Sequence, residues 1–121
     1  MFKVEADKSK KLLEIAFAGE VDAAGAKACV DRVELLLASL EPGFTLLNDL
    51  SQLLRMDMNC APHLERSMEL CNKAGVARIV RVISDPAKDI GLNILSAFHY
   101  KHRPRTVVCE TMEEAAKVLG L

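Results

Sequence analysis

Three strand patterns in this chain are each followed by a helix pattern, and this order restricts the fold more than any other feature. Apolar runs at 44–47, 76–83 and 106–109 each lead into a helix start signal and an amphipathic segment. Strands joined through helices lie parallel in one sheet, and the connecting helices pack on its faces. The sequence therefore predicts an α/β domain with a mostly parallel sheet.

The N-terminal part of the chain adds an antiparallel edge to this sheet. Apolar and charged residues alternate over 2–7, and apolar residues alternate again over 13–17 after a polar turn at 8–10. This arrangement is typical of a β-hairpin. Asp22 then starts a helix that is expected to run to about Leu40. The predicted order over 1–121 is β-β-α-β-α-β-α-β-α, which we interpret as a single domain.

Cap residues set the expected limits of the later helices. Gly75 stands where the second helix should end, because glycine accepts the left-handed backbone of a C-terminal cap. Asp85 and the proline after it predict the start of a third helix, and Pro104 ends it. Thr111 and Glu114 form a capping box at the start of the last helix.

The stretch 45–60 joins a predicted buried strand to the second helix through a polar loop. The residues at 48–51 are expected to end the strand, and Asp57 and Asn59 each have a side-chain oxygen that can cap the helix. In open parallel sheets, ligands and partners bind at the carboxyl ends of the strands. The expected interaction or ligand site therefore consists of Asp49, Ser51, Arg55, Asp57, Met58, Asn59, Cys60 and His63.

Net charge and composition exclude several classes of function. The 121 residues contain 16 Lys and Arg and 17 Asp and Glu, so a formal net charge of -1 provides no field that attracts nucleic acid or a membrane surface. There is no apolar run long enough to span a bilayer and no secretory signal pattern. The four cysteines are then expected to be reduced. We predict a cytoplasmic protein without nucleic-acid binding or membrane insertion.

Patterns for catalysis and metal binding are weak. Cys60 and His63 lie near a predicted helix start, where a thiol can become reactive, but most free cysteines are buried and inert. His99, His102 and Cys109 do not have a zinc-site spacing. Phosphate-binding glycine loops and a nucleophile elbow are absent from the sequence. We therefore predict no enzymatic activity, no cofactor and no metal, with a thiol enzyme using Cys60 as a third alternative.

Three short motifs stand at element boundaries: one after the second strand, one after the third strand and one at the start of the last helix. They are Gly19–Asp22, Asp49–Ser51 and Thr111–Ala116. Together with the element order, they resemble the STAS domain of bacterial anti-sigma factor antagonists and of sulfate-transporter tails. The resemblance covers nearly the whole chain. It implies a SpoIIAA-like fold, a bacterial cytosol, and either a protein partner or a second copy of the chain.

The chain departs from this family in the loop before the second helix. In the antagonists the loop reads Asp-Ser-Ser-Gly or Asp-Ser-Thr-Gly, and one hydroxyl is phosphorylated by the anti-sigma kinase. The matching residues here are Asp57, Met58, Asn59 and Cys60, so neither central position carries a hydroxyl. The resemblance therefore implies a non-catalytic regulatory module without the standard phosphoserine switch. A domain that binds a small ligand, such as a lipid or a nucleotide, is the alternative.

Overall fold

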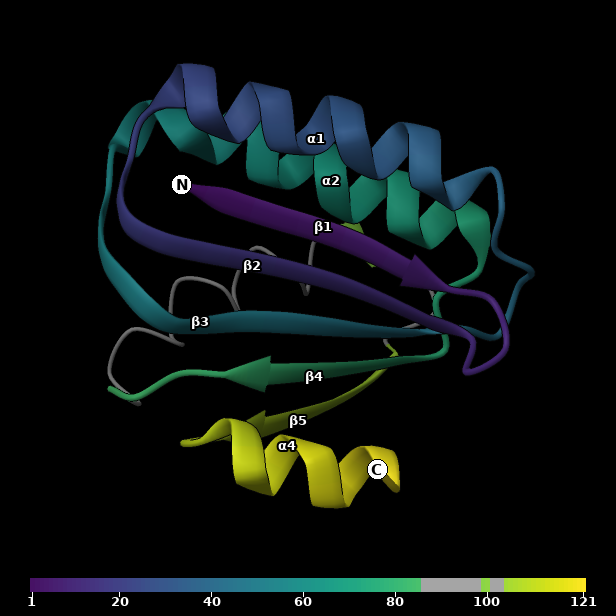
Figure 1. Ribbon diagram of the computed structural model, residues 1–121. Helices are drawn as coiled ribbons and strands as arrows, with labels where there is room; N and C mark the ends of the chain where they lie inside the picture. The colour runs from purple at the N-terminus through teal and green to yellow at the C-terminus, as the bar shows by residue number, and fades with distance from the viewer. Residues whose placement is uncertain (86–98, 101–103) are drawn as a thin grey trace.

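Five strands form one sheet in the computed structural model, which describes residues 1–85, 99–100 and 104–121 (Figure 1). Their order in the sheet is the order in the sequence. The strands are β1 (Phe2–Asp7), β2 (Leu12–Val21), β3 (Thr45–Met56), β4 (Arg78–Val82) and β5 (Arg105–Cys109). β1 and β2 are antiparallel, and all later neighbours are parallel. The predicted α/β class, with a hairpin at one edge, is confirmed.

Helices pack on the two faces of this sheet. α1 (Ala23–Leu37) and α2 (Ala61–Ala74) lie side by side over one core, and α4 (Met112–Leu119) packs against β4 and β5 (Figure 1). The helix predicted to follow Asp85 lies outside the described residues and stays a prediction. Within the described ranges, no helix is long and apolar enough to cross a membrane.

Alternation of side chains along the strands separates two apolar layers. In β4, Ile79 joins the larger core with α1 and α2, whereas Val80 and Val82 join a second cluster that includes Cys109 and Ala115. Successive residues of a strand point to opposite faces, and here both faces are covered. This is why the β4 segment has a nearly continuous apolar sequence rather than an alternating one.

Most of the predicted cap residues mark the observed helix ends. Asp22 and Thr111 each accept a hydrogen bond from a backbone amide of the following first turn, at 2.8 and 3.2 Å. Gly75 ends α2 with a φ of 91°, a left-handed conformation that glycine adopts without strain. α1 ends at Leu37, three residues before the predicted Leu40.

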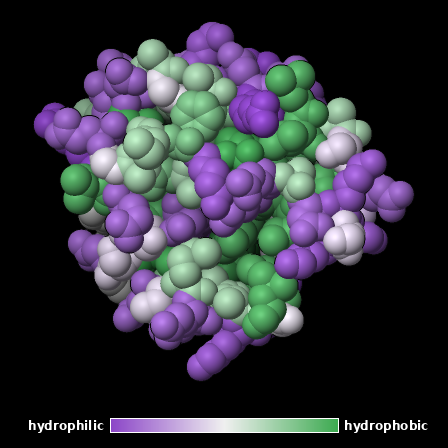
Figure 2. Space-filling view, viewed as in Figure 1, coloured by the Kyte–Doolittle hydropathy of each residue, from purple (hydrophilic) through white to green (hydrophobic). Residues whose placement is uncertain are grey.

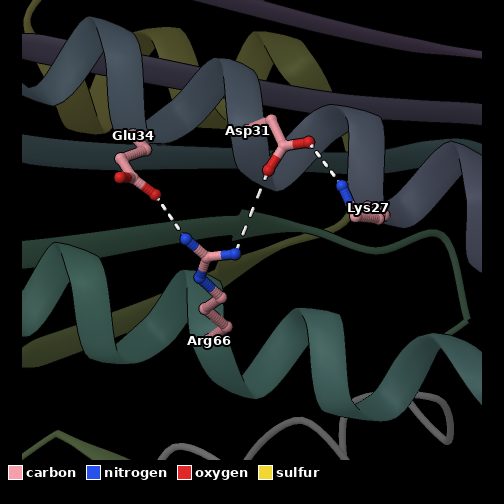
Figure 3. A network of polar contacts seen from close by, with 4 residues as sticks. All are labelled: Lys27, Asp31, Glu34 and Arg66. Atoms are coloured by element: carbon pink, nitrogen blue, oxygen red, sulfur yellow. Dashed lines mark hydrogen bonds and ion pairs between the residues drawn. The ribbon is translucent and has the colours of Figure 1, made fainter.

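A network of charged side chains joins the outer surfaces of α1 and α2 (Figure 3). Arg66 of α2 donates a hydrogen bond to Glu34 of α1, and its guanidinium lies 3.9 Å from Asp31. Lys27 also binds Asp31, at 3.0 Å. These side chains are about half exposed, so each pair contributes only about 0–1 kcal/mol. The network therefore orients two helices whose stability comes mainly from the core beneath them.

Candidate functional site

β3 continues past the point where the sequence predicted a loop. It pairs with β4 only as far as Asp49, opposite Val82, and from there to its end it pairs with β2. The prediction that residues 48–51 end the strand was wrong, because β2 is itself longer than expected and supplies partners as far as Val21. The first two residues of the predicted loop 55–60 therefore belong to the strand.

Two β-bulges explain why this part of β3 resembles a turn in the sequence. The pairing with β2 shifts between Asp49 and Gln52 and again between Leu53 and Arg55, and each shift adds one residue to β3. At the first bulge, the Asp49 Oδ1 atom accepts hydrogen bonds from the Ser51 backbone N–H at 3.0 Å and from the Ser51 hydroxyl at 2.6 Å. The hydrogen bond from a backbone N–H to the aspartate side chain, which is typical of turns, is thus present, but here it lies inside a strand.

The chain passes from β3 into α2 through Asp57 and a short 3₁₀ turn, η1 (Met58–Cys60). The Asp57 Oδ1 atom accepts from the Asn59 N–H at 2.9 Å, and the Asp57 N–H donates to the Val21 carbonyl at 3.0 Å. The predicted capping role of Asp57 is confirmed for the 3₁₀ turn. Asn59 does not cap α2, because the N-cap position falls one residue later, on Cys60, which makes no side-chain cap.

Cys60 is a packing residue rather than an exposed thiol. Its side chain is buried, and its Sγ atom lies 3.6 Å from the Val21 carbonyl oxygen, to which the thiol donates. Burial raises the pKa of the Cys60 thiol, and the carboxylate of Asp57 raises it further. Among the described residues, no hydrogen bond connects Cys60 to the half-buried His63. This environment opposes the formation of a nucleophilic thiolate.

We expect Cys60 of the native protein to react slowly with iodoacetamide near pH 7. The thiolate is the reactive form, and a thiol with a raised pKa has a smaller thiolate fraction at this pH. Burial should lower the rate further, to about one hundredth of the rate in urea. Peptide mass spectrometry of samples quenched over time measures the modification of each cysteine. Fast modification of native Cys60 alone would contradict this assignment and revive the thiol-enzyme alternative.

Several predicted site residues do come together where β3 ends. Leu54 and Met58 are large apolar side chains that are 77% and 90% exposed. Arg55 and Asp57 are exposed charged residues of the same segment. We call these four residues the β3 tip. Asp49 and Ser51 lie back along the strand, so the predicted site is split in two.

A polar hollow of about 320 Å³ lies between the β3 tip and the start of α1. It contains the carboxylates of Glu20, Asp22 and Asp57, and the Arg55 side chain also lines it. Two of these carboxylates already accept hydrogen bonds from backbone amides as caps. In the part of the chain that the structure describes, no three His, Cys, Asp or Glu residues are arranged to hold a metal ion.

An apolar cavity of about 240 Å³ lies on the other side of the β3 tip, and the sequence interpretation missed it. It lies along the part of β3 beyond the last residue paired with β4. Its lining residues are Phe17, Asn48, Leu50, Leu53, Leu54, Arg55, Met56, Leu64, Ile83 and Ser84. The sequence does contain a signal for this cavity. It is the group of leucines at 50, 53 and 54, which would not be expected in an exposed polar loop.

These elements define a class of α/β protein with an antiparallel hairpin at one edge of a parallel sheet, and solved structures share its architecture over nearly the whole chain. The anti-sigma factor antagonist SpoIIAA in its unphosphorylated form is similar with a TM-score of 0.63 and 21% identity, over 100% of both chains. An uncharacterized protein of the DUF3478 family from Shewanella loihica PV-4, described as having a SpoIIAA-like fold, has a TM-score of 0.71 and 13% identity, over 98% of this chain and 92% of its own. An anti-sigma factor antagonist from Mycobacterium paratuberculosis has a TM-score of 0.60 and 18% identity, over 100% of this chain and 94% of its own.

At these identities the comparison establishes the fold. The chain has the SpoIIAA-like fold, which the resemblance of its three motifs implied. No family model matches the sequence, and no curated protein matches it.

Proposed function

We propose that this chain is a non-catalytic regulatory module of the cytoplasm that binds a protein partner, or a second copy of itself, through the β3 tip. The observation that carries the proposal is the exposure of Met58, which is 90% exposed directly before α2. SpoIIAA and the Mycobacterium protein, which share the fold, are anti-sigma factor antagonists by name. A role in regulation by protein binding is therefore the function that fold and surface support together.

The chemistry of the β3 tip fits a protein interface. Methionine has a flexible, polarisable side chain that adapts to irregular apolar surfaces, and it is common at binding surfaces. Leu54 adds a second exposed apolar group, and Arg55 and Asp57 place one charge of each sign beside them. Hydrophobic surface is not confined to this region, since Figure 2 shows green patches scattered among hydrophilic side chains. In the β3 tip, exposed Leu54 near the end of β3 is followed by exposed Met58 on the turn that Asp57 caps.

We further propose that the module works without a phosphoserine at this turn. SpoIIAA has been solved in a phosphorylated and in an unphosphorylated form. Phosphorylation adds nearly two negative charges, and its effect is strong at a helix N-terminus. Met58 and Asn59 have no hydroxyl that could carry this group. Partner binding at the β3 tip would then be controlled by concentration or by a ligand.

Replacing Met58 with glutamate tests the interface. M58E places a charge at the centre of the proposed contact, so we expect it to weaken capture of the native partner from cell extract by about tenfold or more, the scale of an interface hot spot. Leu35→Glu is the matched control, because Leu35 is 70% exposed on α1. Quantitative mass spectrometry of captured proteins and sedimentation velocity measure partner binding and self-association.

Both variants should keep the stability of the parent protein to within about 0.5 kcal/mol, because both positions are on the surface. Equal capture by M58E and Leu35→Glu, with unchanged self-association, would contradict the proposal. Asp57 is a poorer position for this test, since its carboxylate caps the turn and its replacement would disturb the backbone.

Small-ligand binding is a second candidate function. The observation that favours it is the apolar cavity beside the β3 tip, which lies at the carboxyl end of β4, where ligands bind in open parallel sheets. The cavity shares Leu54 and Arg55 with the β3 tip, whereas Met58 and Asp57 do not line it, so Met58 is the position that tests the protein interface alone.

A further inference from the structure

We propose that the cavity beside β3 binds a monoanionic single-chain amphiphile, a medium-chain carboxylate, with its acyl chain between β3 and Ile83 and its carboxylate at Arg55. The inference rests on the small-ligand candidate above. The cavity shares Leu54 and Arg55 with the β3 tip, but Met58 does not line it, so substitution of Met58 tests the protein interface separately.

The cavity results from the way in which β3 and β4 separate. Their pairing ends at Asp49 and Val82, and β3 continues along β2 while Ile83 donates its backbone N–H to Cys109 of β5 at 2.8 Å. The end of β3 is thus held by β2, and the segment after β4 is held by β5, on opposite sides of the gap. The second bulge, between Leu53 and Arg55, interrupts the regular alternation, so that consecutive residues from 53 to 56 line the same cavity.

The lining of the cavity selects an apolar chain. Seven of the ten described residues that line it are apolar, and Asn48 and Ser84 are the neutral polar ones among these ten. A volume of about 240 Å³ corresponds to about eight groups of the size of a water molecule, at about 30 Å³ each. A methylene group is of similar size, so a chain of about eight carbons fills the space.

The charge at the rim selects the head group. Arg55 is the one charged residue among the described residues that line the cavity, and its side chain is exposed. Within the described ranges it makes no ion pair. A guanidinium presents two parallel N–H donors that match a carboxylate. An anionic head with a short acyl tail therefore matches both the rim and the interior.

Titration with octanoate tests this assignment. Calorimetry should show saturable binding at one molecule per chain, and amide resonances of Leu50, Leu53 and Leu64 should shift in NMR spectra. Arg55→Gln should weaken octanoate binding about two- to fivefold, the range for an exposed ion pair, and should leave octanol binding unchanged. Arg32→Gln, which removes an exposed cation from α1, is the matched control and should change neither.

Five results would overturn the proposal, of which four concern monomeric ligands in solution. They are the absence of saturable octanoate binding, resonance shifts on another face, equal binding of octylammonium, and equal effects of Arg55→Gln and Arg32→Gln. Vesicles of anionic phospholipid separate a free carboxylate from a membrane surface, and binding to vesicles without binding to monomeric octanoate would also overturn it. M58E should retain octanoate binding, so loss of partner capture and loss of ligand binding remain distinguishable.

Discussion

Arg81→Ala is expected to lower the free energy of unfolding by about 3–5 kcal/mol, the range for removal of a large buried side chain with polar contacts. Arg81 lies in β4 and is only 1% exposed, and it is among the largest fully buried side chains of the described chain. It lines a small internal cavity with Asn48 and Tyr100. Burial raises the pKa of Tyr100, and the charge of Arg81 opposes that rise. Alanine would leave both a void and a changed charge in the core.

Arg78→Ala is the matched control, since it removes the same side chain from the same strand. The Arg78 Nε atom donates to Thr45 Oγ1 at 3.4 Å, and its Nη1 atom donates to the Val118 carbonyl at 3.3 Å, near the end of α4. Loss of these partly exposed hydrogen bonds should cost about 1 kcal/mol. Urea unfolding followed by circular dichroism measures both values. Equal destabilisation by the two substitutions would contradict the different burial of the two arginines.

Gly75→Ala is expected to destabilise the protein by about 2–4 kcal/mol, as the sum of a left-handed backbone penalty and an overpacking cost. Gly75 has a φ of 91°. A Cβ atom added there would lie 2.8 Å from the Cβ atom of Pro42 and 3.1 Å from its Cα atom. The neighbour is a proline ring and its backbone, which cannot rotate away as a flexible side chain would.

Gly43→Ala separates these two costs. Gly43 has nearly the same φ, 92°, but a Cβ atom added there meets nothing within 4 Å. It also lies at the same corner of the fold, where its N–H donates to the Gly75 carbonyl at 2.8 Å. We expect only the backbone penalty, about 1–2 kcal/mol, from Gly43→Ala. If thermal and urea unfolding give the same loss for both alanines, the contact with Pro42 is not as close as the structure shows.

The place of the candidate segment in the fold could be predicted from the sequence, but its form could not. Arg55, Asp57 and Met58 do stand at the end of a strand and before a helix, as the turn residues and the parallel pattern predicted. The prediction that Asn59 caps the second helix was wrong, because a single turn of 3₁₀ helix shifts the start of α2 by a few residues. Cys60 is a buried packing residue, the interpretation that the sequence favoured over a reactive thiol, and its burial depends on α1 and β2 packing over it.

Features that depend on nearby residues were determined by the sequence itself. The caps at Asp22, Thr111 and Gly75 involve groups within a few positions of each other, and the apolar stripes of α1 and α2 follow from the geometry of one helix. The alternation of strand and helix patterns was sufficient to predict a mostly parallel sheet with a hairpin at one edge, because strands joined through helices lie parallel.

The length of β3, the burial of Arg81 and the cavity were decided only by the tertiary structure. β3 extends to Met56 because it pairs with the backbone of β2, which lies more than thirty residues earlier in the chain. The local sequence around β3 does not indicate this pairing. Arg81 is buried whereas Arg78 of the same strand is partly exposed, and which of these positions would be sealed depended on where α1, α2 and α4 pack. The physical reason is that backbone pairing and burial are properties of segments brought together by folding, whereas periodicity and capping are properties of a single segment.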